Sequence, residues 1–209
     1  AGSVSLAPAD DTGNSNSDNL TNLSSVNLRI SFDNSSGDGT AAAVKDEIQL
    51  YKNGNAVGDP IVVNETDLNR GYVTTASKVT LTEGVDDEWT VIITDRANLD
   101  SVTSAALIVQ LDQTAPTAAI SDPVVIADGY VNKAEVESAL VVTGTTSGAE
   151  PGQTVTLTLT DEHNKTVVKT GTVSGDAYSI KVSSYDQKKL TDGDTISVTV
   201  KVTDKAGNE

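Results

Sequence analysis

Apolar and polar residues alternate along most of this chain, which is the pattern of half-buried β-strands. The run TVTLTLTD (154–161) shows the alternation most clearly, and WTVIITD (89–95) repeats it earlier in the chain. Valine, isoleucine and threonine dominate these runs, and their branched side chains favour a pleated surface. A helical period is confined to VNKAEVESALV (131–141). The pattern therefore predicts an all-β fold.

The alternating runs predict seven strands in the first half of the chain and six in the second. The first seven cover residues 4–8, 26–32, 47–54, 60–65, 78–83, 89–95 and 104–111. The other six cover residues 118–121, 138–146, 154–161, 166–173, 178–184 and 195–204. Asn53 and Gly54 predict a hairpin turn, because both residue types tolerate a positive φ. Seven strands is the number in a constant-type immunoglobulin domain.

One phrase occurs twice. LTEGVDDEWTVIITDRANLD (81–100) returns as LTDGDTISVTVKVTDKAGNE (190–209), about 109 residues later. Each copy combines an acidic, glycine-containing turn, an alternating strand and a loop that opens on aspartate. A period near 100 residues is the size of one sandwich domain, so we expect two tandem immunoglobulin-like β-sandwich domains in an extended arrangement.

The expected boundary lies at Asp112-Gln-Thr-Ala-Pro116, because Pro116 prevents regular strand pairing and holds its neighbour extended. The predicted domains are residues 1–112 and 113–209. After the second copy of the repeated phrase, no counterpart of SAALIVQL (104–111) follows. We therefore expect the second domain to lack its last strand, or to receive that strand from another segment.

Composition narrows the function. The 209 residues hold 14 basic and 30 acidic side chains, a formal net charge of −16, with no cysteine. This balance argues against a nucleic-acid partner, which needs clustered Lys and Arg. No apolar run reaches the length of about 18 residues that a membrane span requires. His163 is the only histidine, it lies in an expected hairpin turn, and no glycine-rich phosphate loop follows a strand, so we expect a non-catalytic monomer.

The acidic residues suggest a metal. Immunoglobulin connectivity would gather several of them at the end of the first domain, and would bring Glu150 and Asp204 to the facing end of the second. Two carboxylates about 4 Å apart repel by about 4 kcal/mol at an effective dielectric of 20. Because Ca²⁺ accepts six to eight oxygen ligands, it would turn that repulsion into attraction. The acids expected at the end of the first domain are Asp10, Asp11, Asp18, Asp86, Asp87 and Asp112.

We therefore predict calcium sites at or near the domain junction, and further sites at the free ends of both domains. Asp128 and Glu135 would serve the free end of the second domain, and Asp33, Asp38 and Asp95 that of the first. None of these loops has the spacing of an EF-hand. The complete set of predicted calcium ligands is Asp10, Asp11, Asp18, Asp95, Asp112, Asp128, Glu135, Glu150 and Asp204.

Three phrases carry a family resemblance: LDQTAP (111–116), SGAEPGQTVTLTLTD (147–161) and VTDKAGN (202–208). They resemble the bacterial Ig-like repeats in the stalks of giant secreted adhesins, including RTX-type biofilm and ice-binding adhesins. The resemblance implies a calcium-rigidified extender at the bacterial cell surface, whose partners are neighbouring repeats of the same polypeptide. It suggests calcium ligation most strongly for Asp112, Glu150 and Asp204. The chain departs from the family at SFDNSSGDGTAAAVKDE (31–47), which stands where the GAEPG phrase would be expected.

A ligand-binding module near the adhesin tip is the alternative. The threonines of TVTLTLT (154–160) form a ladder on one strand face, which could order water or ice, although threonine also simply suits the solvent side of a strand. Glycan or peptide capture would most naturally involve the SFDNSSGDGT loop (31–40). Trp89 is expected to fill the core, with sugar stacking as the alternative.

Overall fold

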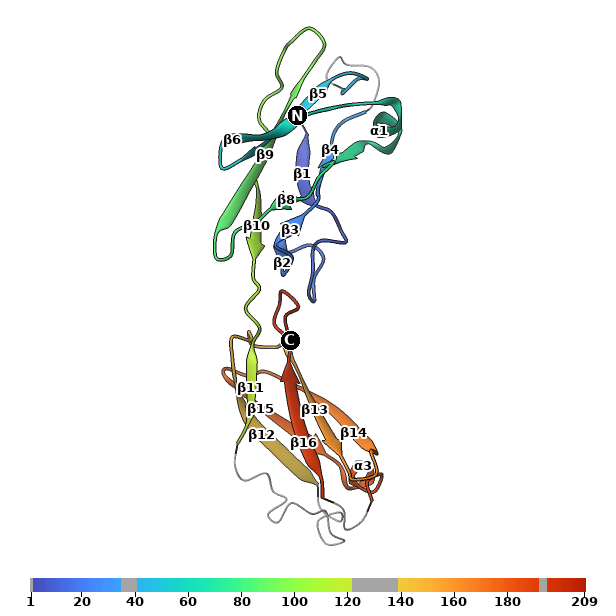
Figure 1. Ribbon diagram of the computed structural model, residues 1–209, viewed down its shortest axis with the longest axis vertical. Coiled ribbons are helices and arrows are strands. Elements are labelled where there is room, and N and C mark those ends of the chain that lie inside the picture. The colour runs from blue at the N-terminus through green and yellow to red at the C-terminus, as the bar shows by residue number, and fades with distance from the viewer. Residues whose placement is uncertain (1, 35–40, 122–138, 192–194) are drawn as a thin grey trace. The chain divides into compact units, whose positions relative to one another are not determined.

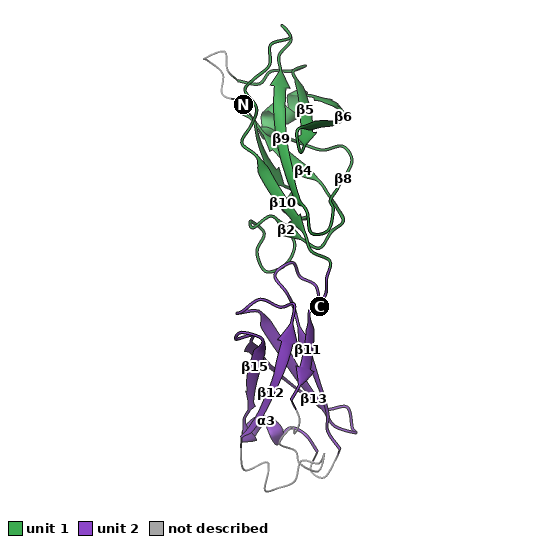
Figure 2. Ribbon diagram, turned by 90° about the vertical axis from the view of Figure 1, so that its left-hand side faces the viewer, with its two compact units in different colours: residues 1–113 green, residues 114–209 purple. Residues whose placement is uncertain are grey.

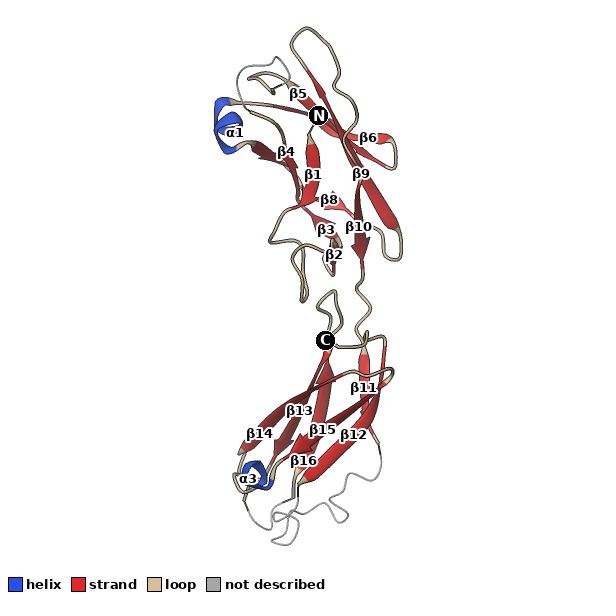
Figure 3. Ribbon diagram, turned by 180° about the vertical axis from the view of Figure 1, so that it is seen from behind, coloured by secondary structure: helices blue, strands red, loops and turns tan. Residues whose placement is uncertain are grey.

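The structure, a computed structural model, describes residues 2–34, 41–121, 139–191 and 195–209 (Figure 1). The chain divides into two compact units, unit 1 at Ala1–Gln113 and unit 2 at Thr114–Glu209 (Figure 2). Strands dominate both units, and the helices described are single short turns (Figure 3). The predicted all-β class is confirmed. None of the helices in the described part of the chain is long and apolar enough to span a bilayer.

Unit 1 holds ten described strands and one helix, α1 (Glu65–Arg70). The strands are β1 (Ser3–Leu6), β2 (Leu20–Thr21), β3 (Ser25–Val26), β4 (Leu28–Ser31), β5 (Glu47–Lys52), β6 (Asn55–Val62), β7 (Tyr72–Thr74), β8 (Val79–Thr80), β9 (Asp86–Thr94) and β10 (Leu107–Leu111). They form a three-stranded sheet β1-β4-β7, a five-stranded sheet β2-β10-β9-β5-β6 and the pair β3-β8. Buried side chains from all three make one core, in which Trp89 is 1% exposed. Trp89 therefore fills the core, as expected.

The β5–β6 hairpin follows its turn signal but not the predicted strand bounds. Asn53 and Gly54 have φ values of 49° and 78°, and Lys52 pairs with Asn55 across the turn. The second strand was expected at 60–65, yet β6 already begins at Asn55. Pro60 lies inside it, which is tolerated because β6 is the edge strand of its sheet.

Helix α1 and strand β7 were missed by the alternating pattern. The Asn64 side chain accepts a hydrogen bond from the Asp67 backbone, and the Asp67 side chain accepts one from the Asn64 backbone, which makes a capping box. Gly71 ends the helix in the left-handed conformation, with φ of 76°. These three residues were the available sequence signal for the helix. Because strand β7 was missed as well, the expected count of seven strands in this half was too low.

Unit 2 holds two three-stranded sheets, β11-β12-β15 and β14-β13-β16, with a short helix α3 (Ser184–Gln187). The strands are β11 (Thr117–Ile120), β12 (Leu140–Ser147), β13 (Thr154–Thr160), β14 (Thr166–Thr172), β15 (Ala177–Val182) and β16 (Ser197–Val202). All six predicted strands are present within a few residues. Val142 and Ile180 from the first sheet share one core with Leu157 and Leu159 from the second. The predicted helical stretch 131–141 lies almost wholly outside the described residues.

One glycine of unit 2 is required by packing. Gly144 lies on β12, and the Tyr178 hydroxyl of β15 passes over it to donate a hydrogen bond to the Ala119 carbonyl of β11, at 3.1 Å. A Cβ at position 144 would lie 2.0 Å from that carbonyl oxygen and 2.3 Å from the hydroxyl. The hydrogen bond thus ties two strands that are not neighbours in the sheet.

Candidate functional site

The loop between β1 and β2 in unit 1 carries the first group of predicted calcium ligands. Its first aspartate, Asp10, is 6% exposed and accepts hydrogen bonds from the Asn27 backbone at 2.6 Å and from Lys78 Nζ at 3.4 Å. The buried Thr21 hydroxyl donates to the Asp10 carbonyl at 2.7 Å. Asp10 therefore anchors the loop to the rest of the unit, and both of its carboxylate oxygens are occupied.

Asp11 differs from its neighbour. Its side chain is buried, the residue being 8% exposed, and Oδ1 has no hydrogen-bond partner among the described residues. Burial raises the pKa of Asp11, the Asn19 backbone N–H lowers it, and the nearby Asp18 carboxylate raises it again. Asp18 itself is exposed and accepts from the Leu20 backbone at 3.2 Å. The loop thus holds two carboxylates together and leaves one buried oxygen without a donor.

This arrangement fits a hard cation better than it fits the protein alone. A buried acceptor without a partner costs about 1–3 kcal/mol, and two adjacent carboxylates repel each other. Ca²⁺ would satisfy both, because it binds carboxylate, amide, hydroxyl and carbonyl oxygens. The residues between Asp11 and Asp18 read TGNSNS and supply further oxygens of these kinds. Among the described residues, however, no three His, Cys, Asp or Glu side chains form a group that could hold a metal.

In unit 2, Glu150 contacts the loop that begins at Asp204, through the backbone of Lys205. Asp204 is 0% exposed, and its Oδ1 accepts from the backbone N–H groups of Gly207 and Asn208, both at 2.8 Å. Glu150 Oε2 accepts from the Lys205 backbone N–H at 3.1 Å. Both predicted ligands therefore accept hydrogen bonds from the backbone of the same loop, residues 205–208, and hold it in place.

Asp95 has the same role in unit 1. Its Oδ1 accepts from the Ala97 and Leu99 backbones at 2.8 and 2.9 Å, and its own N–H donates to the Leu99 carbonyl. The N–H of Asp204 donates to the Asn208 carbonyl in the same way. The repeated phrase in the sequence thus corresponds to one repeated device, in which an aspartate closes the loop after a strand.

The other acids expected at the end of the first domain have separate partners. Asp87 is 1% exposed and forms an ion pair with Lys52 Nζ at 2.8 Å. Asp86 accepts from the Gln110 side chain at 2.7 Å. Asp112 is partly buried, and its backbone N–H donates to the Thr21 carbonyl at 2.9 Å. The side chains of Asp86 and Asp87 are therefore engaged by partners from their own sheet, Gln110 and Lys52.

The structure reveals two further aspartates that pattern reasoning missed. Asp161 closes the β13–β14 hairpin: burial raises its pKa, but hydrogen bonds from the backbones of Thr191, Lys165 and His163 outweigh burial and lower it to about 2. Asp186 lies between Lys169 Nζ at 2.6 Å and Lys189 Nζ at 2.8 Å, and these bonds hold its pKa well below its usual range. Both are structural, since donors of unit 2 surround them.

Asp128 and Glu135, and with them Asp38, lie outside the described residues. Of the described predicted ligands, the structure brings together Asp11 with Asp18, and Glu150 with the Asp204 loop. Asp10 and Asp95 serve chiefly as backbone anchors. The Asp11–Asp18 pair is therefore the candidate site with an unmet need for a ligand.

Three solved structures to which the chain is similar come from adhesins or large adhesion proteins, the class that the sequence resemblance indicates. The first is a Ca²⁺-stabilized adhesin that helps an Antarctic bacterium reach out and bind ice, with 22% identity, a TM-score of 0.47, and coverage of 100% of this chain and 46% of that chain. The second is a 1.5-MDa bacterial ice-binding adhesin studied for host cell surface retention, with 19% identity, a TM-score of 0.43, and coverage of 99% and 60%.

The third is a tetra-tandem repeat in the extending region of a large adhesion protein, with 23% identity, a TM-score of 0.38, and coverage of 100% and 47%. The chain spans about half the length of these solved structures. No protein-family model matches the sequence, and no curated protein matches it either.

Proposed function

We propose that this chain is a non-catalytic extender segment of a large bacterial surface adhesin, made of Ig-like repeats that Ca²⁺ stiffens. The observation that carries the proposal is the buried Asp11 Oδ1, which lacks a hydrogen-bond donor and lies beside a second carboxylate. A folded protein with such an oxygen gains stability when a cation binds to it. In this role the adhesin would extend from the cell surface into the surroundings.

Two further features support an extender. Equivalent aspartates, Asp95 in unit 1 and Asp204 in unit 2, close the loop that follows a strand. This is expected of repeated modules that differ in sequence but share one architecture. Each unit also has its own core, so each would remain folded while the chain is pulled or bent. The adhesin class in this proposal comes from the family resemblance of the sequence, and the repeated loop and separate cores support a segment built of repeated modules.

Within this proposal, Asp11 and Asp18 hold one Ca²⁺, with additional oxygens from their loop or from water. Bound Ca²⁺ would supply positive charge that neutralises the two carboxylates, while the Asp10 and Thr21 contacts hold the loop in place for it. Ligation by Asp112, Glu150 and Asp204 at the junction of the domains remains a prediction from the sequence. Asp95, Asp128 and Glu135 remain predicted ligands toward adjoining repeats.

A chelator titration of the full chain tests the proposal. Because Ca²⁺ binds only the folded state, the melting temperature should rise with Ca²⁺ concentration and fall on addition of EGTA. Small-angle scattering should give a larger radius of gyration in Ca²⁺ than in EGTA, with Mg²⁺ as the control for general screening. A melting temperature and a radius of gyration that both ignore EGTA would sink the proposal.

A further inference from the structure

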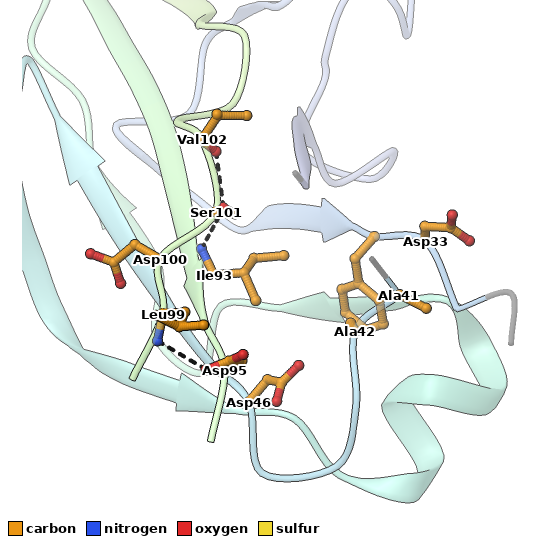
Figure 4. Close-up of a pocket in the computed structure, with 11 residues that line it drawn as sticks. Asp33, Ala41, Ala42, Asp46, Ile93, Asp95, Leu99, Asp100, Ser101 and Val102 are labelled. Atoms are coloured by element: carbon orange, nitrogen blue, oxygen red, sulfur yellow. Dashed lines mark hydrogen bonds between the residues drawn. The ribbon is translucent and has the colours of Figure 1, made fainter. Parts of the chain in front are cut away.

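Two cavities of unit 1 differ in what their polar groups still lack. The first, of about 320 Å³, lies beside the loop after β9 (Figure 4). Hydrogen bonds already engage Asp95 and Ser101 there, and no residue that lines this cavity has a buried polar atom without a partner in the described part of the chain. The second cavity, of about 710 Å³, is lined by a residue that does have such an atom.

The second cavity lies at the edge of the five-stranded sheet of unit 1. Residues 57–61 of β6 and residues 75–80, which lead from β7 into β8, form much of its lining. Leu50 and Lys52 of β5 and Trp89 of β9 complete the wall on the side of the sheet. The cavity therefore reaches the core of unit 1 from a sheet edge.

Trp89 is the residue whose hydrogen bonding is incomplete. It is 1% exposed, and its Nε1–H is buried without an acceptor among the described residues. A buried indole N–H usually has a partner, and a buried donor without one carries the full cost of its lost hydration. A ligand that brings an acceptor oxygen to this N–H would remove that cost.

The charges of the lining favour an uncharged ligand. Lys52 Nζ forms an ion pair with Asp87 at 2.8 Å and donates to the Thr80 carbonyl at 2.9 Å. Lys78 Nζ forms an ion pair with Asp10 at 3.4 Å. Both cations of the lining thus have counter-ions already. Because burying an unpaired charge is costly, an anionic ligand would bind poorly here.

The edge of β6 argues against an added strand as the ligand. Pro60 has no N–H to donate, and the pairing of β6 with β5 is interrupted between Val57 and Ile61, where Gly58 has a φ of 66°. The exposed carboxylate of Asp59 lies in the same stretch. Proline, irregular pairing and charge are the features that protect a sheet edge from pairing with another chain. The cavity therefore suits a small molecule better than an extended polypeptide.

The lining also indicates the body of that molecule. Leu50 and Val79 are buried core residues, and Val57 and Ile61 pack against the same core while partly buried. Trp89 is the only aromatic residue among those that line the cavity, and its ring has no exposed face on which a sugar would stack. A cavity of about 710 Å³ falls within the range of about 300 to 1,000 Å³ of small-molecule sites. An aliphatic body fits this wall.

We propose that this cavity binds a small uncharged molecule with a branched aliphatic body and a carbonyl oxygen, such as an amide. The carbonyl oxygen accepts a hydrogen bond from Trp89 Nε1, and the body packs against Leu50, Val57 and Ile61. Because Nε1 is buried, side chains of the lining shift slightly to admit the oxygen. The site needs no Ca²⁺ and is independent of the proposed extender role.

The test is a titration of the full 209-residue chain with N-acetyl-leucinamide in EGTA, followed by NMR of the Trp89 indole N–H, the only one in the sequence. Its resonance should move downfield as the hydrogen bond forms. N-acetylglycinamide keeps the carbonyl groups but lacks the aliphatic body, and should bind at least about tenfold more weakly. N-acetyl-leucine carries a carboxylate, and should also bind about tenfold more weakly.

Variants place the interaction. Ala76 lines the cavity and is exposed, so Ala76→Leu should fill part of the cavity without disturbing the core and weaken binding by about tenfold. Ala105→Leu makes the same change at an exposed position outside the lining, and should bind as the wild type does. Trp89→Phe removes the N–H, and calorimetry should show binding weakened by about tenfold.

Four results would each overturn the proposal. They are an indole resonance that does not move, equal binding of either comparison compound, unchanged binding by Ala76→Leu, and tighter binding of the peptide acetyl-Gly-Gly-Leu-Gly-Gly-amide. The last result would assign the cavity to a polypeptide partner instead of a small molecule. Ala76→Leu decides the matter even if Trp89→Phe fails to fold, because Ala76 is not part of the core.

Discussion

The substitution Asp11→Asn should make the protein more stable than the wild type in chelator and less stable than the wild type in calcium. Without calcium, wild-type unit 1 carries a buried oxygen with no donor, a cost of about 1–3 kcal/mol. The asparagine amide can donate to Asp18, and it removes the carboxylate whose pKa is raised first by burial and then by the nearby Asp18 charge. We therefore expect Asp11→Asn to stabilise the calcium-free unit by about 1 kcal/mol, or about 4 °C in melting temperature.

With Ca²⁺ at about 100 times its dissociation constant, the wild type should gain about 2.7 kcal/mol. The variant loses a charged ligand and should gain little, so wild type should then be the more stable protein by about 2 kcal/mol. Trp89 makes the measurement specific, because it is the only tryptophan and lies in the core of unit 1. Thermal melts followed by its fluorescence report unfolding of this unit within the intact chain.

Asp59→Asn is the matched control, since Asp59 is exposed and its substitution changes the net charge equally. Its melting temperature should respond to calcium as the wild type does. If Asp11→Asn lowers the melting temperature by the same amount in EGTA and in calcium, Asp11 has a purely structural role. The calcium assignment would then be refuted.

Two further predictions concern unit 2. The pKa of Asp161 is lowered to about 2 from an ordinary value of 3.8, so its stabilising effect is complete above about pH 4 and is lost as the pH falls toward 2. In urea melts, the difference in unfolding free energy between wild type and Asp161→Asn should therefore shrink over that pH range. The control Asp176→Asn, at an exposed position, should show no such trend. Gly144→Ala should destabilise unit 2 by about 1–3 kcal/mol through overpacking, because the new methyl group meets a carbonyl and the Tyr178 hydroxyl. Gly171→Ala should cost less, since its new Cβ would meet a side-chain atom, Ile180 Cγ1 at 2.7 Å, rather than a backbone carbonyl at 2.0 Å. Equal losses for the two variants would contradict this packing argument.

Sequence periodicity was a sound guide where strands are long and one face is buried. The six strands of unit 2 follow from alternation alone, because β13 buries Val155, Leu157 and Leu159 while the threonines between them lie on the other face. In unit 1 the alternation fails at β6, whose residues are mostly exposed at a sheet edge. It also fails at α1, which is set by its capping residues rather than by a hydrophobic period.

The candidate site was predictable only in part. Repetition of the aspartate-led loop identified Asp95 and Asp204 as related positions, and their shared hydrogen-bonding role confirms that relation. Composition could not distinguish Asp11, with its unpartnered oxygen, from Asp87, whose carboxylate is held by Lys52 from a different strand. Both are buried aspartates beside a second aspartate in sequence, and only their long-range partners differ.

The sequence by itself determined the β class, the strands with a buried face and the repeated loop, since these depend on periodicity and on neighbours close in the chain. The tertiary structure alone decided which carboxylates already have partners and which, like Asp11, keep a buried oxygen without one among the described residues. The physical reason is that a carboxylate's partners, such as Lys52 for Asp87 or Thr191 for Asp161, come from segments distant in sequence. The sequence shows which residue stands at a position, whereas the fold determines which groups surround it.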